Sequence, residues 1–197
     1  MGVSPAPPLL LASTSPQRRA ILEQLHLPFE VVAPRYEEGK AAGADPVQLV
    51  LAHARGKARS VAAAAGDRPV LGVDTAVVLH GAVYGKPAGA TEAETMLERL
   101  AGETHEVVSG LCLLTRGWEE LHHEATRVTF RPLTPRERGL YVAAGEWEGR
   151  AGAYAVQGLG AALVERIEGD YLNVVGLPGA LLVRLLARRF GGLYGFG

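Results

Sequence analysis

The chain has 197 residues, of which 48% are hydrophobic and 21% charged, and its formal net charge is −1. This length suits one domain, and the near-neutral charge argues against a nonspecific nucleic-acid binder or a membrane-surface protein, both of which are basic. No apolar stretch approaches the roughly 18 residues that a bilayer-spanning helix needs, and residues 1–5 lack the basic lead of a signal peptide. We therefore expect a cytoplasmic protein that binds neither nucleic acid nor membrane.

The first predicted element is a short buried strand over residues 9–12 that runs into a helix. Ser15 is a good N-cap, and Pro16 suits the first helical position. The free backbone N–H groups of such a helix start form an anion site. Arg18 lies on the buried face of this helix, from which its forked guanidinium can reach over the helix start to a phosphate. A structural ion pair is the alternative interpretation of Arg18.

Two adjacent acids lie in the next connection. Residues 29–33 alternate as a strand does, and residues 34–45 form a predicted loop that carries Glu37 and Glu38. Adjacent acids on a loop are usually solvated. They can also hold a divalent cation that phosphates bring with them.

Lys57 interrupts the apolar face of the next helix, which is predicted over residues 47–65. It shares one stripe with Val50, Ala54 and Val61. Its side chain either reaches along the protein surface to solvent or points into a cleft at an anionic ligand. The pattern leaves both interpretations open.

Asp74 stands between the apolar runs 70–73 and 76–79, which are predicted to be short buried strands. We therefore expect Asp74 at the end of a strand. A charge at such a junction is costly to bury unless it is paired or used. Lys86 follows in a loop between Gly85 and Pro87. The simpler alternative is a solvated aspartate with an unrelated surface lysine.

The rest of the chain alternates between helices and strands. The predicted elements, in order, are a helix over 92–100 opened by a capping box of Thr91 and Glu94, a long hairpin of strands 105–115 and 119–131, a helix from 135 to 145, a stretch of small residues over 150–160, a strand over 161–167, a loop over 169–176 and a last helix over 178–190.

Five motifs in order resemble those of the Maf family of nucleoside triphosphate pyrophosphatases, and the resemblance extends from Leu9 to about Leu186. Each motif alone is weak, but all five in order are a strong signal. The motifs are L-A-S-T-S-P-Q-R-R at 11–19, G-V-D-T at 72–75 with G-K-P at 85–87, L-A-G-E-T-H-E-V-V-S-G at 100–110, A-G-A-Y-A-V-Q-G at 151–158 and N-V-V-G-L-P at 173–178.

The resemblance implies an α/β fold with a mixed twisted sheet and flanking helices, related to the inosine triphosphate pyrophosphatases. In that fold the sheet separates two lobes around a cleft. The whole chain, residues 1–197, is then a single Maf-like domain with two lobes. A homodimer is the oligomer that the resemblance implies.

The chemistry implied is cleavage of a nucleoside triphosphate between its α- and β-phosphates. Cations that offset phosphate charge meet the main demand of this reaction class. In this chain Asp74 would act on the attacking water as the catalytic base, and Glu38 with Asp74 would hold Mg²⁺ or Mn²⁺. The implied substrate-binding residues are Ser13, Arg18, Lys57 and Lys86.

Specificity in the family is associated with positions that are Gln17, Thr75 and Gln157 here. Thr75 and Gln157 match the subgroup that acts on dTTP and UTP, whereas Gln17 stands where that subgroup has arginine. Arg150 stands where lysine is usual. We favour dTTP and UTP as substrates. The alternatives are a pyrophosphatase for modified nucleotides such as 7-methyl-GTP, and a non-catalytic, nucleotide-sensing regulator of septation.

Overall fold

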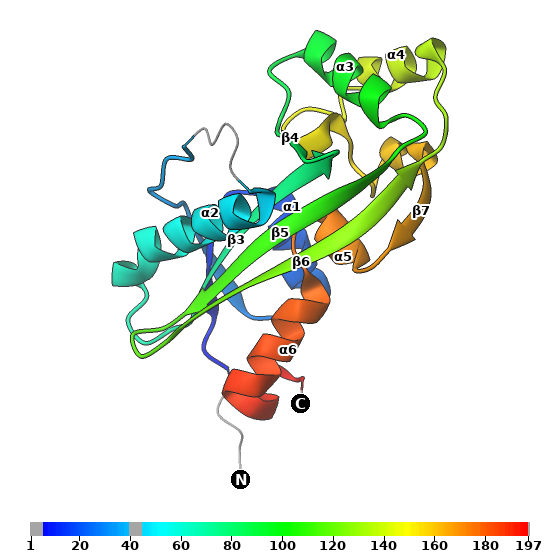
Figure 1. Cartoon of the computed structure of the whole chain (residues 1–197). Coiled ribbons are helices and arrows are strands. Elements are labelled where there is room, and N and C mark those ends of the chain that lie inside the picture. The colour runs from blue at the N-terminus through cyan, green and yellow to red at the C-terminus, as the bar shows by residue number, and fades with distance from the viewer. Residues whose placement is uncertain (1–5, 40–44, 197) are drawn as a thin grey trace.

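The computed structural model describes residues 6–39 and 45–196 (Figure 1). Seven strands in this part of the chain form one mixed sheet in the order β2-β1-β3-β5-β6-β7, with β4 paired to β3 beside this path. The predicted mixed sheet with flanking helices is confirmed. The strands are β1 (Leu9–Ala12), β2 (Phe29–Val32), β3 (Val70–Leu79), β4 (Ala82–Tyr84), β5 (Thr104–Leu114), β6 (Glu119–Phe130) and β7 (Val164–Glu168).

Helices cover both faces of the sheet. Helix α2 lies along one face of β3 and β5, α1 and α6 pack on the opposite face, and α3 and α4 gather at the far end of the long strands (Figure 1). None of the helices in the described ranges is long and apolar enough to cross a membrane. Their bounds are α1 (Pro16–Gln24), α2 (Pro46–Val61), α3 (Ala90–Leu100), α4 (Pro135–Ala143), α5 (Tyr171–Val175) and α6 (Gly179–Phe190), with 3₁₀ turns at Ala62–Ala64, Ala151–Ala153, Leu159–Leu163 and Gly191–Tyr194.

Two glycines let α2 lie unusually close to the sheet. A Cβ on Gly110 of β5 would lie 2.5 Å from the carbonyl carbon of Val50 and 2.7 Å from the nitrogen of Leu51. A Cβ on Gly72 of β3 would lie 2.8 Å from the Cβ of Ala58. Side chains of α2 therefore reach the strand residues directly beneath the helix.

The edge of β3 is open in its middle. Strand β1 pairs with residues 70 and 71 of β3, and β4 pairs with residues 77–79. On the other edge β5 pairs with β3 continuously, and Asp74 lies opposite Gly110. Among the described residues, the stretch 72–76 between β1 and β4 thus has a strand neighbour on one side only.

This continuous pairing corrects the expectation for Asp74. The residue lies in the middle of one ten-residue strand and not at a strand end. The strand continues through the charge because the open edge of β3 leaves the carboxylate beside a cavity, where it can find partners.

Three further expectations differ from the structure. Helix α3 begins at Ala90 with Gly89 as its N-cap, so Thr91 already lies in the first turn and the capping box with Glu94 is wrong. Residues 159–163 form a 3₁₀ turn, and the strand begins only at Val164. The predicted loop over 169–176 contains α5, whose start is capped by the Asp170 carboxylate, which accepts a hydrogen bond from the backbone of Leu172.

The other main elements agree with the sequence pattern. The long β5–β6 hairpin is paired from Thr104 to Leu114. Helix α2 starts at Pro46 with Asp45 as a side-chain N-cap, and its predicted apolar stripe is buried. The predicted loop 34–45 lies partly outside the described residues.

Candidate active site

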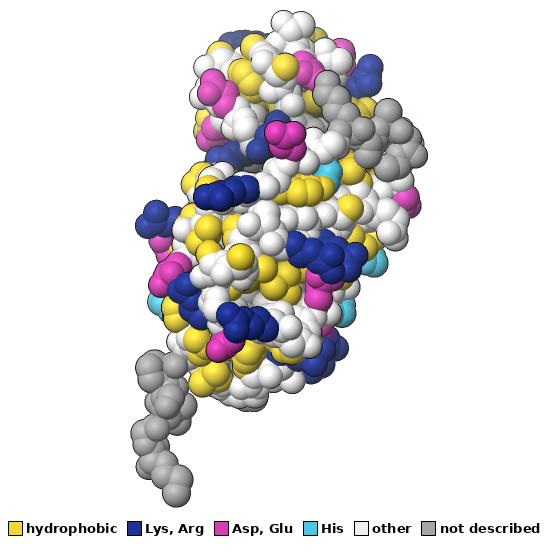
Figure 2. Space-filling view, turned by 90° about the vertical axis from the view of Figure 1, so that its left-hand side faces the viewer, with side chains coloured by type: hydrophobic (Ala, Val, Ile, Leu, Met, Phe, Trp, Pro, Cys, Tyr) yellow, Lys and Arg dark blue, Asp and Glu magenta, His cyan; other side chains and the backbone are white. Residues whose placement is uncertain are grey.

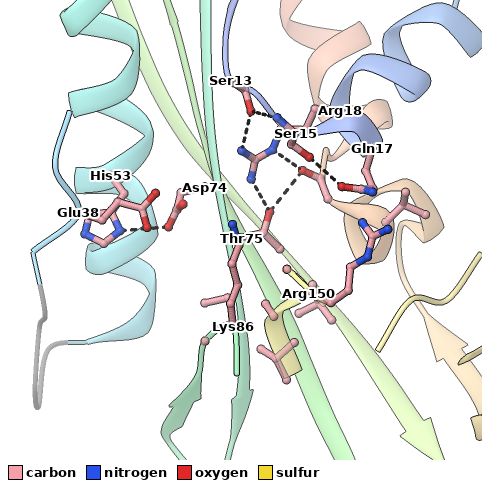
Figure 3. Close-up of a pocket in the computed structure, with 18 of the residues that line it drawn as sticks. Ser13, Ser15, Gln17, Arg18, Glu38, His53, Asp74, Thr75, Lys86 and Arg150 are labelled. Carbon is pink, nitrogen blue, oxygen red and sulfur yellow. Dashed lines mark hydrogen bonds and ion pairs between the residues drawn. The ribbon is translucent and has the colours of Figure 1, made fainter. Parts of the chain in front are cut away.

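A cavity of about 670 Å³ lies at the open edge of β3. It is lined by the segment after β1, one face of α2, the middle of β3, the loop after β4, and residues from the segments 148–154 and 174–176. Because neighbouring side chains of a strand point to opposite faces, Asp74 and Thr75 bring two different groups of side chains to this one cavity (Figure 3).

The first group surrounds the Asp74 carboxylate, which is mostly buried. Lys57 Nζ donates to Asp74 Oδ1 at 2.5 Å and lies 2.6 Å from Glu38 Oε1. His53 Nδ1 lies 3.2 Å from Asp74 Oδ2. Burial acts to raise the pKa of Glu38, but the hydrogen bond and charge of Lys57, with the charges of His53 and Lys86, outweigh it and lower the pKa. The Lys57 side chain is buried in the cavity lining and does not reach along the protein surface to solvent; that it binds an anionic ligand there stays a prediction.

His53 was missed by the sequence reasoning, although a signal was present. It lies three residues after Val50 and four before Lys57, which places it on the same buried stripe of α2. The Tyr36 ring packs edge-on against its imidazole with centroids 5.9 Å apart. A histidine and a lysine on one apolar helix face indicate together that this face packs against polar groups or borders a polar cavity.

The second group is centred on Arg18, on the opposite face of β3. Its Nε donates to the carbonyl of Gly176 at 2.9 Å, and its two terminal nitrogens donate to Ser13 Oγ at 3.2 Å and Thr75 Oγ1 at 3.3 Å. Thr75 Oγ1 is also 2.9 Å from Ser109 Oγ. Burial lowers the pKa of Arg18, and the charges of Asp74 and Glu38 offset part of this effect. The guanidinium is therefore held rigidly in the cavity wall.

Two further cations border the cavity. Lys86 is exposed in the loop after β4, which is tied down where Gly152 donates its backbone N–H to the Gly85 carbonyl at 3.1 Å. Arg150 also lines the cavity, and its Nε is buried without a hydrogen-bond partner in the described part of the chain. Near the start of α1, Ser15 Oγ donates to Gln17 Oε1 at 3.0 Å.

The structure brings most of the predicted site residues together. One of them lies elsewhere: Gln157 is exposed and is not part of the cavity lining, although Tyr154 of the same segment is. The predicted residues that line the cavity are Ser13, Gln17, Arg18, Glu38, Lys57, Asp74, Thr75 and Lys86.

The first group also fits a divalent metal ion. Glu38, His53 and Asp74 each offer one ligand atom, and these atoms lie within 4.8 Å of one another. Carboxylate oxygens and imidazole nitrogens are ligands of divalent cations in proteins. The cavity can thus offer fixed cations, a carboxylate base and a metal-binding set to one anionic ligand.

Several known proteins are similar to this chain. The protein named "dTTP/UTP pyrophosphatase" from Nitratidesulfovibrio vulgaris is 48% identical, with 93% of this chain and 89% of that protein covered. Proteins of the same name from Moorella thermoacetica and Deinococcus radiodurans are 49% and 43% identical, covering 91% and 100% of this chain and 93% and 100% of their own lengths.

A solved structure, described as "Structure of a HAM1 protein from Coxiella burnetii", matches more weakly. It is 17% identical, with a TM-score of 0.42, and the match covers 62% of this chain and 72% of that chain. Similarity at this level does not assign the fold. The family model described as "Maf-like protein" matches residues 8–189. With this match and the full-length relatives, the chain belongs to the Maf family.

Proposed function

We propose that this protein hydrolyses nucleoside triphosphates, above all UTP and dTTP, to the monophosphate and pyrophosphate. The proposal is supported by relatives named "dTTP/UTP pyrophosphatase" that match over most of their length. The observation that carries it is the position of Asp74. This carboxylate borders the same cavity as Arg18, Lys57 and Lys86.

The cations meet the electrostatic demand of the reaction. A triphosphate brings several negative charges, and more charge collects on the leaving pyrophosphate as the bond breaks. Arg18 is fixed by three hydrogen bonds before any substrate arrives. A cation that is already in place needs no reorganisation during the reaction and so favours the transition state.

Asp74 would accept the proton of the attacking water. The water oxygen attacks the α-phosphorus, the bond from that phosphorus to the bridging oxygen breaks, and the electron pair leaves with pyrophosphate. An ionised carboxylate has about four lone-pair positions. Lys57 and His53 contact one position on each Asp74 oxygen, so positions are left for the water.

The metal-binding residues would be Glu38 and Asp74, with His53 beside them, and the metal Mg²⁺ or Mn²⁺. When bound, the ion supplies positive charge that polarises the phosphate oxygens. In its absence the Lys57 ammonium pairs with both carboxylates and offsets part of their charge.

We assign base selection to Gln17 and Thr75 in the cavity lining, and to Gln157, which is exposed outside this lining on the segment that follows Tyr154. A glutamine amide offers both a donor and an acceptor, which matches the mixed edge of uracil or thymine. A pyrophosphatase for 7-methyl-GTP or a non-catalytic nucleotide sensor would be distinguished by the substrate profile. The homodimer stays a prediction, which light scattering would check.

The test is a panel of canonical and modified triphosphates with product analysis. We expect UTP and dTTP to give the highest kcat/KM, with one monophosphate formed for each pyrophosphate. Highest activity on 7-methyl-GTP would assign the other subgroup. Binding of nucleotide without hydrolysis would leave the protein a sensor.

A further inference from the structure

We propose that His53 is a nitrogen ligand of the divalent-metal site and makes this site bind Mn²⁺ and Co²⁺ more tightly than Mg²⁺. The inference deepens the proposed function, because it concerns the metal at the same cavity. It gives a role to a buried histidine that the proposed cleavage step does not otherwise need.

The spacing of the side chains supports shared ligation. His53 Nδ1 and Asp74 Oδ2 are 3.2 Å apart. At a metal–ligand distance of about 2.1 Å, adjacent octahedral ligands lie about 3.0 Å apart. A neutral imidazole nitrogen without a proton and a carboxylate oxygen are both acceptors, so their approach requires a proton or a cation between them. A metal ion satisfies this requirement as well as a proton does.

The position of the Lys57 ammonium indicates where a metal ion would bind. Its ammonium nitrogen lies 2.5 Å from Asp74 Oδ1 and 2.6 Å from Glu38 Oε1. Oxygens of the two carboxylates therefore converge on one positive group, and the His53 ring borders the same place. Because the ammonium and a metal ion would draw on the same two carboxylate groups, Lys57 and the metal compete.

The environment holds the imidazole in position. The His53 side chain is 10% exposed, and the edge-on contact with Tyr36 restricts its ring. The backbone of α2 is pressed against the sheet at Gly72 and Gly110, which fixes the backbone that carries His53 relative to β3 and β5.

The ligand type decides which metal binds best. Mg²⁺ prefers oxygen ligands and gives up its water shell reluctantly, whereas imidazole suits the later first-row transition metals. Two carboxylates alone would serve Mg²⁺ adequately. The added nitrogen gives its larger advantage to Co²⁺ and a smaller one to Mn²⁺, which stands lowest in the affinity order of these divalent transition metals.

The test measures binding of Mn²⁺ alone to the full chain, without nucleotide, from the loss of the free-ion electron paramagnetic resonance signal. Mg²⁺ and Co²⁺ compete in the same assay. We expect Mn²⁺ to bind at least tenfold more tightly than Mg²⁺, and Co²⁺ more tightly still. Pulsed resonance on the Mn²⁺-loaded protein should show coupling to a directly bound nitrogen.

His53→Leu keeps the stripe of α2 apolar and removes the ligand. We expect it to weaken Mn²⁺ at least tenfold, to change Mg²⁺ less than threefold and to abolish the nitrogen coupling. His123→Leu, which removes an exposed histidine of β6, should leave all three unchanged. Unfolding midpoints confirm that the variants are folded. Lys57→Met removes the competing ammonium and should tighten Mn²⁺ several-fold.

Absence of nitrogen coupling in the parent protein would overturn the proposal. Equal loss of Mn²⁺ and Mg²⁺ affinity in His53→Leu would do the same, and would leave His53 as a positioning residue for Asp74. Because no nucleotide is present, these outcomes are independent of whether the protein cleaves UTP.

Discussion

Replacing Gly110 by alanine should disturb the site through the packing of α2. The added Cβ would lie 2.5 Å from the Val50 carbonyl carbon and 2.7 Å from the Leu51 nitrogen. Heavy atoms in contact prefer a separation of about 3.5 Å, so the helix must move by about 1 Å. Both obstructing atoms are backbone, and neither can turn aside as a side chain would.

The expected cost follows from this overlap. Overpacking a well-packed interior destabilises by about 1–3 kcal/mol, and the backbone contact places Gly110→Ala near the upper end. For a chain of this size, about 3 kcal/mol lowers Tm by about 6–12 °C. Displacement of His53 and Lys57 relative to Asp74 by about 1 Å should also lower kcat/KM by up to about 100-fold.

Urea unfolding and steady-state hydrolysis of UTP measure the two effects. Gly139→Ala is the matched control, since a Cβ there meets nothing within 4 Å and the residue lies inside α4. That substitution should stabilise by about 0.5–1 kcal/mol. A Gly110→Ala protein with parent-like midpoint and activity would show that α2 does not depend on this close contact.

Three other predictions concern stability, phosphate binding and base selection. Burial lowers the pKa of His105 to about 4, so below pH 6.5 the unfolded chain binds a proton that the folded protein does not bind. The free energy of unfolding should therefore fall by about 3 kcal/mol between pH 6.5 and pH 4. A His105→Gln variant with the same pH dependence of stability would refute this explanation. Lys86→Met should lower kcat/KM for all triphosphates by similar factors, because a cation beside phosphates carries no information on the base, and an effect on one base alone would contradict the assignment. Because Gln157 is exposed, its hydrogen bond to a base would have the ordinary net value, so Gln157→Glu should penalise UTP relative to GTP by about 0.5–1.5 kcal/mol in kcat/KM; an unchanged ratio would mean that the base is read elsewhere.

Much of the site could be predicted from local patterns. Arg18 and Lys57 stand out because they lie on faces of helices that are otherwise apolar, and the 3.6-residue period of a helix reveals this without a structure. Asp74 stands out as a charge within apolar sequence. Each of these signals needs only a few neighbouring residues.

The meeting of these residues depends on strand pairing that local sequence does not specify. Asp74 and Thr75 reach one cavity from opposite faces of β3, because β1 and β4 leave its edge open between residues 71 and 77. The close approach of α2 depends on Gly110, 36 positions along the chain from its pairing partner Asp74.

The sequence pattern did not predict helix α5 for a related reason. Its five residues include valines with low helix propensity. Asn173 holds it in place by donating to the Val107 carbonyl at 2.9 Å and to Thr126 Oγ1 at 3.1 Å, both far away in sequence. Short elements of this kind are stabilised by contacts that the local pattern does not contain.

The charges on the protein surface agree with the near-neutral net charge of the sequence. On the face in Figure 2, Lys and Arg side chains lie in separate groups among acidic and apolar ones. Several cations of the protein are paired, as Arg55 and Arg59 are with Glu119. The cations that border the cavity thus differ from the other surface cations by lying around the cavity that contains Asp74. The net charge of the protein does not reveal them.

The most direct test of the account is the hydrolysis of UTP by parent and Asp74→Asn proteins, with UMP, UDP, phosphate and pyrophosphate resolved. We expect the parent to form UMP and pyrophosphate in equal amounts. Asp74→Asn should keep the fold, as judged by its unfolding transition, and lose roughly 100-fold or more in kcat, the scale for loss of a general base. Formation of UDP and phosphate, or an Asp74→Asn protein that works at nearly the parent rate, would contradict the central claim.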